Sequence, residues 1–151
     1  VVTAMQRIAQ AFEKGERLAA LVERAKARPA VATAVVHPVD ELSIGGMAAA
    51  MKAGLIVPVL VGPAKRIEEA ARKASVDLTG VEIIDSPHSH AAAARAVALA
   101  REGRASLVMK GALHTDELMA EVVNAANGLR TERRISHVYA LDVPSYHKLL
   151  F

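Results

Sequence analysis

The sequence contains no cysteine and no tryptophan, and aromatic residues make up only 3% of its 151 positions. Without cysteine the chain has no disulfide, no thiolate metal site and no cysteine nucleophile, a composition that fits a reducing compartment, so we expect a cytoplasmic protein. Two Phe and two Tyr offer little surface for stacking on bases, so we expect no nucleic-acid partner. No apolar run approaches the ~20 residues of a membrane span, so we expect no membrane partner either.

The composition is also unlike that of a disordered chain. Hydrophobic residues make up 52% of the sequence and charged residues 23%, and 151 residues are enough to bury a sizeable core as one domain. The apolar residues are mostly Ala and Val, as in parallel sheets that are covered by helices. The formal net charge of +3, with a pI near 9.4, suits an anionic ligand without requiring one.

Five short β-rich runs recur along the chain, over residues 33–38, 57–62, 81–86, 106–111 and 137–144. Helical patterns separate them at a spacing of ~25 residues, which is typical of strand–helix–strand units. We therefore predict an α/β fold, a doubly wound and mostly parallel sheet with helices on both faces.

Helix signals fill the intervals between the runs. The first helix is predicted over residues 3–27. The second is predicted from Ser43, because Gly45 and Gly46 would each cost ~1 kcal/mol in a helix interior. The remaining helices are predicted after Pro63, over residues 88–103, and from an N-cap at Thr115.

Polar and turn residues follow the predicted strands where each strand ends. His37, Ser86 and the pair Lys110–Gly111 all take this position. Because the carboxyl ends of parallel strands share one edge of the sheet, and helix N-termini lie there too, this edge is where an anion is expected to bind. Lys110 is its best cation. Neither G-x-G-x-x-G nor a P-loop is present, so the pattern indicates an anion site of another kind.

Other polar residues admit two interpretations each. His88 and His90 would point about 200° apart on a helix, so we expect no metal there and interpret His88 as a polar helix start that can contact the ligand. Arg130 belongs to a basic loop that is either a solvated surface or a phosphate clamp. His37 and His114 are either packing or helix-start residues, or ligand contacts at the strand edge.

Several segments together resemble a known family. The segments "VVHPVDELS", "AGLIVPVLVGP", "IIDSPHSHAAA", "LVMKGALHTDELM" and "GLRTERRISHVYALDVP" occur in this order. The chain resembles the phosphate acetyl/butyryl transferase family from about residue 16 onward. The resemblance implies a fold similar to isocitrate and isopropylmalate dehydrogenases, with two α/β domains and a cleft between them. It also implies transfer of an acyl group between coenzyme A and inorganic phosphate, with acyl-CoA and phosphate as substrates, no cofactor, no metal, and a homodimer.

The resemblance also suggests roles for particular residues. Lys110 and His114 are the expected catalytic residues, with Lys110 near a phosphate group and His114 bonded to the phosphate or orienting the acyl carbonyl. The expected substrate-binding residues are Gly111, Thr115, Arg130, His37, Ser86 and His88. The thiol of coenzyme A would attack the acyl phosphate directly, so that catalysis rests on positioning and on stabilisation of the oxyanion.

The sequence departs from the family pattern in two ways. Acetyl-specific relatives tend to have Ser-Gly in place of Lys110–Gly111 and an arginine near Ala120 or Glu121, which places this chain nearer the butyryl or broad-specificity group. The family also continues past the last residue here. We therefore expect residues 1–135 to be most of the first α/β domain and residues 136–151 to begin the second domain with its first strand. We expect the remainder, with further catalytic groups, to be missing and this segment alone to be inactive.

Two other functions remain open at this point. The first is a coenzyme A- or nucleotide-binding module with no chemistry, which would bind coenzyme A but transfer no acyl group. The second is a metal-dependent dehydrogenase of the same fold, against which stands the lack of an aspartate cluster at the predicted strand ends.

Overall fold

The computed structural model of the chain describes residues 15–143, 145, 146, 148, 150 and 151. The chain divides into two compact units. One comprises Pro29–Arg133, and the other combines Val1–Arg28 with Arg134–Phe151. Each unit is described by itself below.

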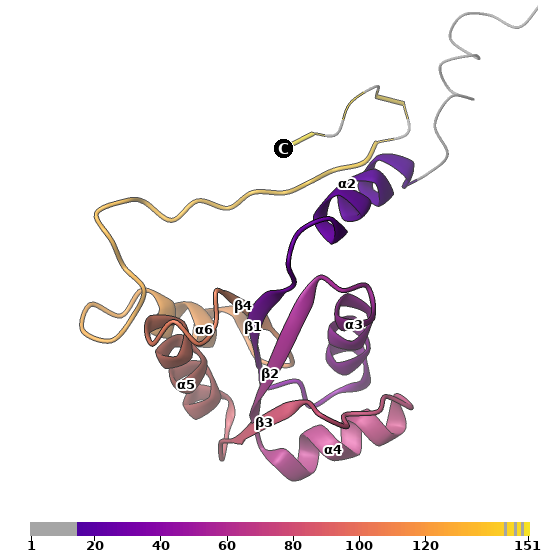
Figure 1. Cartoon of the computed structure of the whole chain (residues 1–151). Coiled ribbons are helices and arrows are strands. Elements are labelled where there is room, and N and C mark those ends of the chain that lie inside the picture. The colour runs from indigo at the N-terminus through magenta and orange to yellow at the C-terminus, as the bar shows by residue number, and fades with distance from the viewer. Residues whose placement is uncertain (1–14, 144, 147, 149) are drawn as a thin grey trace, which may run out of the picture. The chain divides into compact units, whose positions relative to one another are not determined.

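The unit Pro29–Arg133 is built on a parallel sheet of four strands in the order β3-β2-β1-β4 (Figure 1). The strands are β1 (Val31–Val36), β2 (Ile56–Gly62), β3 (Glu82–Asp85) and β4 (Leu107–Lys110). The register brings the ends of the strands level: Val36 pairs with Val61 and Lys110, and Gly62 pairs with Asp85. The prediction that the polar strand ends share one edge is therefore confirmed.

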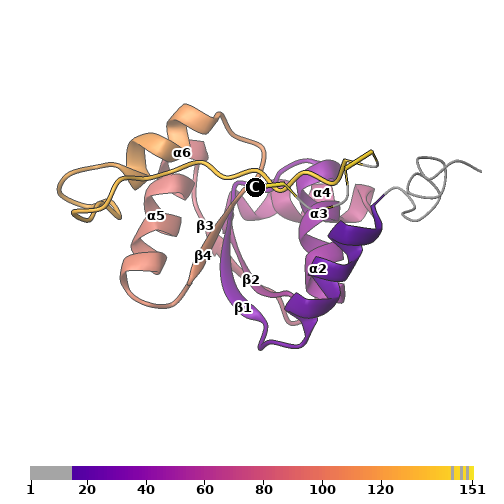
Figure 2. The ribbon, with the colours of Figure 1, turned by 90° about the horizontal axis from the view of Figure 1, so that it is seen from above.

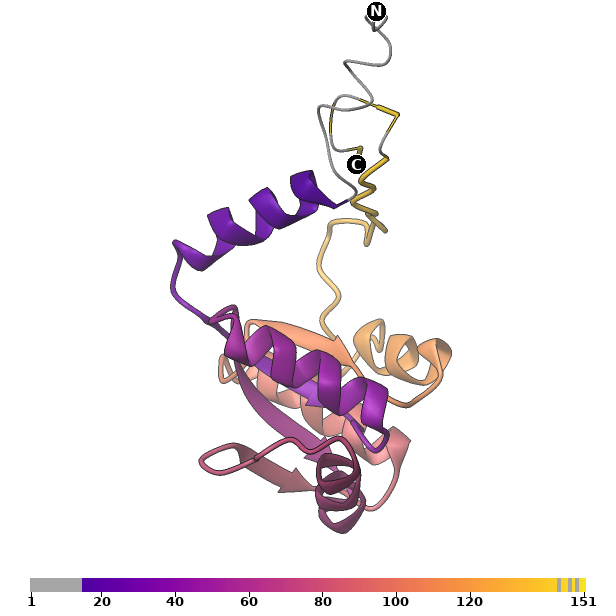
Figure 3. The same cartoon turned by 90° about the vertical axis from the view of Figure 1, so that its right-hand side faces the viewer.

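Helices cover both faces of this sheet, as predicted. Helices α3 (Glu41–Lys52) and α4 (Ala64–Lys73) lie on one face, and α5 (Ser89–Arg101) and α6 (Thr115–Val122) lie on the other (Figures 2 and 3). The alternation of side chains along β1 explains this layering, since Ala34 and Val36 pack into the core under α5 while Val35 packs into the core under α3. None of the described helices is long and apolar enough to cross a membrane.

The core beneath α5 is made largely of small side chains. Ala92, Ala93 and Ala96 are fully buried against β1 and β2, with Leu99 completing the contact. Alanine at these positions lets the helix axis approach the sheet closely. A larger side chain would overpack this layer, at a typical cost of about 1–3 kcal/mol.

The starts of α3, α4, α5 and α6 lie within two residues of the predictions, and the largest difference is at α3. Helix α3 begins at Glu41 rather than Ser43, because the carboxylate of Asp40 accepts a hydrogen bond from the N–H of Ser43 at 2.7 Å and acts as the N-cap. Gly45 and Gly46 therefore lie inside the helix. The favourable cap and the burial of Ile44 and Met47 offset the propensity cost that suggested a later start.

The second unit contains α2 (Glu16–Lys26) and the C-terminal segment. The predicted helix over residues 3–27 is confirmed for this part, and residues 3–14 lie outside the described residues. Asp142 accepts hydrogen bonds from the backbone N–H groups of Arg17 and Leu18, both at 3.0 Å, and forms an ion pair with the Arg17 side chain at 3.2 Å. A carboxylate from the C-terminal segment thus caps the positive end of α2.

The predicted strand over residues 137–144 is not formed. Residues 137–143 are irregular apart from an isolated antiparallel bridge between Leu141 and Leu150, and residue 144 lies outside the described residues. The side chains of Val138 and Tyr139 are 67% and 63% exposed. A segment of high β propensity becomes a strand only when a neighbour supplies its ladder hydrogen bonds, and the described residues offer it only that one bridge. The division into domains at residues 135 and 136 remains a prediction.

Candidate functional site

A pocket at the carboxyl edge of the sheet gathers four of the eight expected site residues, His37, Lys110, Gly111 and His114. We call it the Lys110 pocket; it has a volume of about 460 Å³. It lies where the turn after β4 meets the end of β1 and the first turn of α3. Its lining comprises His37, Asp40, Leu42, Ser43, Ser89, Lys110, Gly111, Ala112, Leu113, His114 and Glu117.

The floor of the pocket is set by the close approach of the β4–α6 turn to the end of β1. The N–H of Gly111 donates to the carbonyl of Val36 at 2.9 Å, and the N–H of Ala112 donates to the carbonyl of His37 at 3.0 Å. A Cβ atom at position 111 would lie 2.4 Å from the oxygen of Val36, which is backbone and has no room to move aside. Only glycine lets the two strand ends meet here.

His37 is held rigidly beside this turn. Its ring Nδ1 lies 2.8 Å from the carbonyl oxygen of Ala112, so Nδ1 carries a hydrogen and donates it. The residue is 6% exposed and has a φ of 52°, a conformation that non-glycine residues rarely adopt. Such backbone strain tends to collect at functional sites. The strained backbone makes His37 a candidate for a functional role, and that role remains a prediction.

Lys110 supplies positive charge at the rim of the pocket. Its ammonium group lies 3.3 Å from the carbonyl oxygen of Gly111, and the side chain is exposed. Asp40 lines the same pocket. Hydrogen bonds from the Ser43 hydroxyl and backbone lower the pKa of Asp40, desolvation opposes them, and the nearby charges of Lys110 and His37 lower it further. Asp40 therefore adds a negative charge to the lining at neutral pH.

The first turn of α6 opens onto the same place. Its N-cap is His114, in an extended conformation, and no side chain forms a cap hydrogen bond with the helix. Thr115 was the predicted N-cap, but it is the first helical residue. His114, the residue before it, keeps an extended backbone and is the N-cap. Uncapped N–H groups at the start of a helix can donate hydrogen bonds to a bound anion.

Glu117 is a member of the pocket that the sequence did not predict. Its Oε1 atom lies 3.5 Å from Nε2 of His90, while its Oε2 atom is buried and has no hydrogen-bond donor among the described residues. A buried acceptor without a partner costs about 1–3 kcal/mol. In the sequence, Glu117 is an acidic residue three positions after His114. Acidic residues are common at the positive start of a helix, so this position gave no reason to assign Glu117 to a site.

The remaining expected residues lie outside the Lys110 pocket. Ser86 is buried, and its backbone N–H donates to the carbonyl of Gly62 at 3.0 Å, which ties β3 to β2. His88 is the N-cap of α5, where its Nδ1 accepts from the N–H of Ala91 at 3.2 Å. Thr115 and Arg130 are exposed. Within the described part of the chain, no group of three or more His, Asp or Glu side chains is placed to hold a metal ion.

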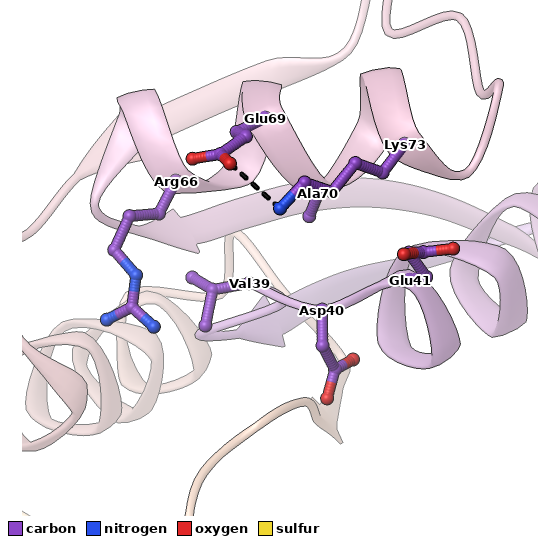
Figure 4. A pocket seen from close by; sticks show the side chains of 7 residues that line it. All are labelled: Val39, Asp40, Glu41, Arg66, Glu69, Ala70 and Lys73. Atoms are coloured by element: carbon purple, nitrogen blue, oxygen red, sulfur yellow. Dashed lines mark ion pairs between the residues drawn. The ribbon is translucent and has the colours of Figure 1, made fainter.

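A second cleft lies between the start of α3 and the flank of α4 (Figure 4). It has a volume of about 290 Å³ and contains none of the predicted site residues. Glu69 and Lys73 form an ion pair along its wall at 2.8 Å, and the Arg66 side chain extends from α4 to a position beside Val39. Its charges are exposed and largely matched within the cleft, so we take the Lys110 pocket as the candidate site.

No protein-family model matches the chain, whereas individual proteins do. It is 55% identical over 131 residues, 87% of its length, to a phosphate acetyltransferase of Rhizobium meliloti, of which it covers 42%. It is 48% identical over 85% of its length to a phosphate acetyltransferase of Rickettsia typhi, covering 37% of that protein. A phosphate butyryltransferase of Clostridium beijerinckii is 34% identical over 87% of the chain, with 43% of that protein covered.

The fold is also similar to part of a solved structure. The EutD phosphotransacetylase from Staphylococcus aureus matches 66% of this chain with a TM-score of 0.54 and 16% identity, and 39% of that protein is covered. The resemblance found from the motifs is thereby confirmed over most of the chain. The two acetyltransferases are more similar than the butyryltransferase, so these identities do not support the interpretation of Lys110 as a mark of the butyryl group. The chain spans about two fifths of the length of these curated relatives.

Proposed function

We propose that the intact protein is a phosphate acyltransferase, which moves an acetyl- or butyryl-type group between coenzyme A and inorganic phosphate. Its similarity to proteins named phosphate acetyltransferase and phosphate butyryltransferase supports the reaction. The observation that carries the proposal is the meeting of Lys110, the Gly111 turn and the uncapped first turn of α6 at one pocket. These groups together suit the phosphate of an acyl phosphate.

In this mechanism the two substrates react directly. The sulfur of coenzyme A attacks the acyl carbon, the new C–S bond forms, and the C–O bond to phosphate breaks with its electron pair leaving on the phosphate oxygen. The thiol proton passes to solvent or to the departing phosphate. Lys110 offsets the negative charge that grows on the phosphate, and His114 donates a hydrogen bond to the phosphate or to the carbonyl oxygen. No acyl-enzyme and no cofactor take part.

The finer features of the proposal rest on the motif resemblance. We infer a two-domain arrangement similar to isocitrate and isopropylmalate dehydrogenases, with the Lys110 pocket on one wall of the cleft. We also infer a cytoplasmic homodimer. Arg130, Thr115, Ser86 and His88 stay candidates for substrate contacts that the second wall of the cleft would complete.

The test is thiol release from acetyl-CoA and butyryl-CoA by the intact protein, with and without phosphate. Release that depends on phosphate is expected, and Lys110→Ala should lower kcat/KM by about 10- to 100-fold, the usual effect of losing a hydrogen bond to a charged group. Lys52→Ala is the matched control, because Lys52 is an exposed lysine at the far end of α3. If coenzyme A binds but no thiol is released from either substrate, the protein is a binding module and the proposal is wrong.

A further inference from the structure

Leu42 stands out at the mouth of the Lys110 pocket. It lies in the first turn of α3, and 86% of its surface is exposed to solvent. Single exposed leucines are common on protein surfaces and need no special explanation. This one, however, lines the same pocket as Lys110, together with the apolar residues Ala112 and Leu113. Asp40 and Glu117 also line the pocket, so its lining combines charged and apolar groups.

The position of Leu42 is fixed by the chain on both sides of it. Asp40 caps α3 through the N–H of Ser43, so the first turn of the helix is held in place over the end of β1. Leu42, Ser43 and Lys110 line the same pocket, so this turn and Lys110 lie close together. A ligand with its anionic group at Lys110 would thus meet Leu42 within the same pocket of about 460 Å³, a volume typical of small-molecule sites.

We propose that Leu42 contacts the acyl chain of the acyl phosphate and raises the selectivity of the enzyme for longer acyl groups. This inference rests on the proposed acyl transfer. An acyl phosphate carries both kinds of group that this lining could contact, a phosphate for Lys110 and a short hydrocarbon for Leu42. Because Leu42 is so exposed, it would lie alongside the acyl chain without closing the pocket. Each added methylene would then gain contact with Leu42, and longer acyl groups would not be excluded.

The experiment measures kcat/KM of the intact protein for acetyl phosphate and for butyryl phosphate at a fixed concentration of coenzyme A, and in a second series the KM for coenzyme A. Full burial of one methylene changes the ratio of kcat/KM between two substrates by up to about fourfold. Butyryl phosphate has two methylenes more than acetyl phosphate, and Leu42 would cover one side of them. Leu42→Ala should therefore lower the butyryl-to-acetyl ratio by about fivefold. Leu42→Met should keep the ratio within about twofold, because its side chain is apolar and of similar volume.

The control is Val57→Ala, which removes an exposed apolar side chain from the opposite end of β2 and should leave the ratio unchanged. An unchanged ratio in Leu42→Ala would overturn the inference, as would a rise in butyryl turnover, which would mean that Leu42 restricts the pocket. Equal losses for both substrates with a raised KM for coenzyme A would assign Leu42 to coenzyme A and also overturn it. If the unaltered protein transfers neither acyl group, it is the proposed function that fails.

Discussion

Substituting Gly111 by alanine should disrupt the structure that forms the candidate site. The added Cβ would lie 2.4 Å from the carbonyl oxygen of Val36 and 2.9 Å from that of His37. Both contacts are with backbone at the end of a buried strand, and neither oxygen can rotate away. The turn after β4 would have to move away from β1.

The cost follows from the contacts that such a movement breaks. Two backbone hydrogen bonds join the turn to β1, and the His37 ring is bonded to the carbonyl of Ala112. At roughly 1 kcal/mol net for each hydrogen bond, separation of the turn from β1 costs about 3 kcal/mol. A small domain has only about 5–15 kcal/mol of stability in total, so this loss is large.

Urea unfolding followed by far-UV circular dichroism would measure the effect on the free energy of unfolding. Gly45→Ala is the matched control, since Gly45 lies inside α3 with no atom within 4 Å of the position of an added Cβ. It should raise stability by about 0.5–1 kcal/mol, the usual gain from Gly to Ala in a helix. A Gly111→Ala variant as stable as the original protein would show that the turn does not pack against β1 in this way.

Three further substitutions test the surroundings of the pocket. Asp40→Ala should cost about 1 kcal/mol at neutral pH, the usual value of an N-cap. The pKa of Asp40 is lowered in the folded state. Its stabilising effect is therefore present above its unfolded pKa of about 3.9 and is lost as the pH falls through the lower folded pKa. The free energies of unfolding of this variant and of the original protein should begin to approach each other near that unfolded pKa and become equal below the folded pKa. Glu117→Met should raise the free energy of unfolding by about 1 kcal/mol, because it removes a buried carboxylate oxygen that has no donor among the described residues. A fall of that size, measured by urea unfolding, would mean that a donor exists. His88→Ala should cost about 1 kcal/mol in thermal unfolding through loss of the α5 cap, and His88→Asn, which can also cap, should restore it.

The sequence was sufficient to predict the layers of the fold and the edge that carries the site. The alternation in β1 and the spacing of the strands are local signals, and parallel pairing then places His37 and Lys110 at the same edge without further information. The sequence also placed Gly111 at this edge, because it follows Lys110 directly. Its close contact with Val36 could not be predicted, because that contact depends on the register between β1 and β4.

Features that depend on contacts between distant segments were missed or misplaced. Leu42 and Glu117 face the same pocket only because the first turn of α3 and that of α6 both lie beside the turn after β4, and no local pattern encodes that meeting. The error at Thr115 was one residue, since the backbone conformation of His114 decides which residue caps the helix. Residues 137–143 have the propensity of a strand, but a strand also needs a neighbour to pair with.

A crystal structure of the intact protein grown with inorganic phosphate would show directly whether the Lys110 pocket binds phosphate. We predict a phosphate in the Lys110 pocket, within hydrogen-bond distance of the Lys110 ammonium group and of N–H groups in the first turn of α6. A phosphate bound instead at Arg130, with the Lys110 pocket filled only by water at saturating phosphate, would contradict it.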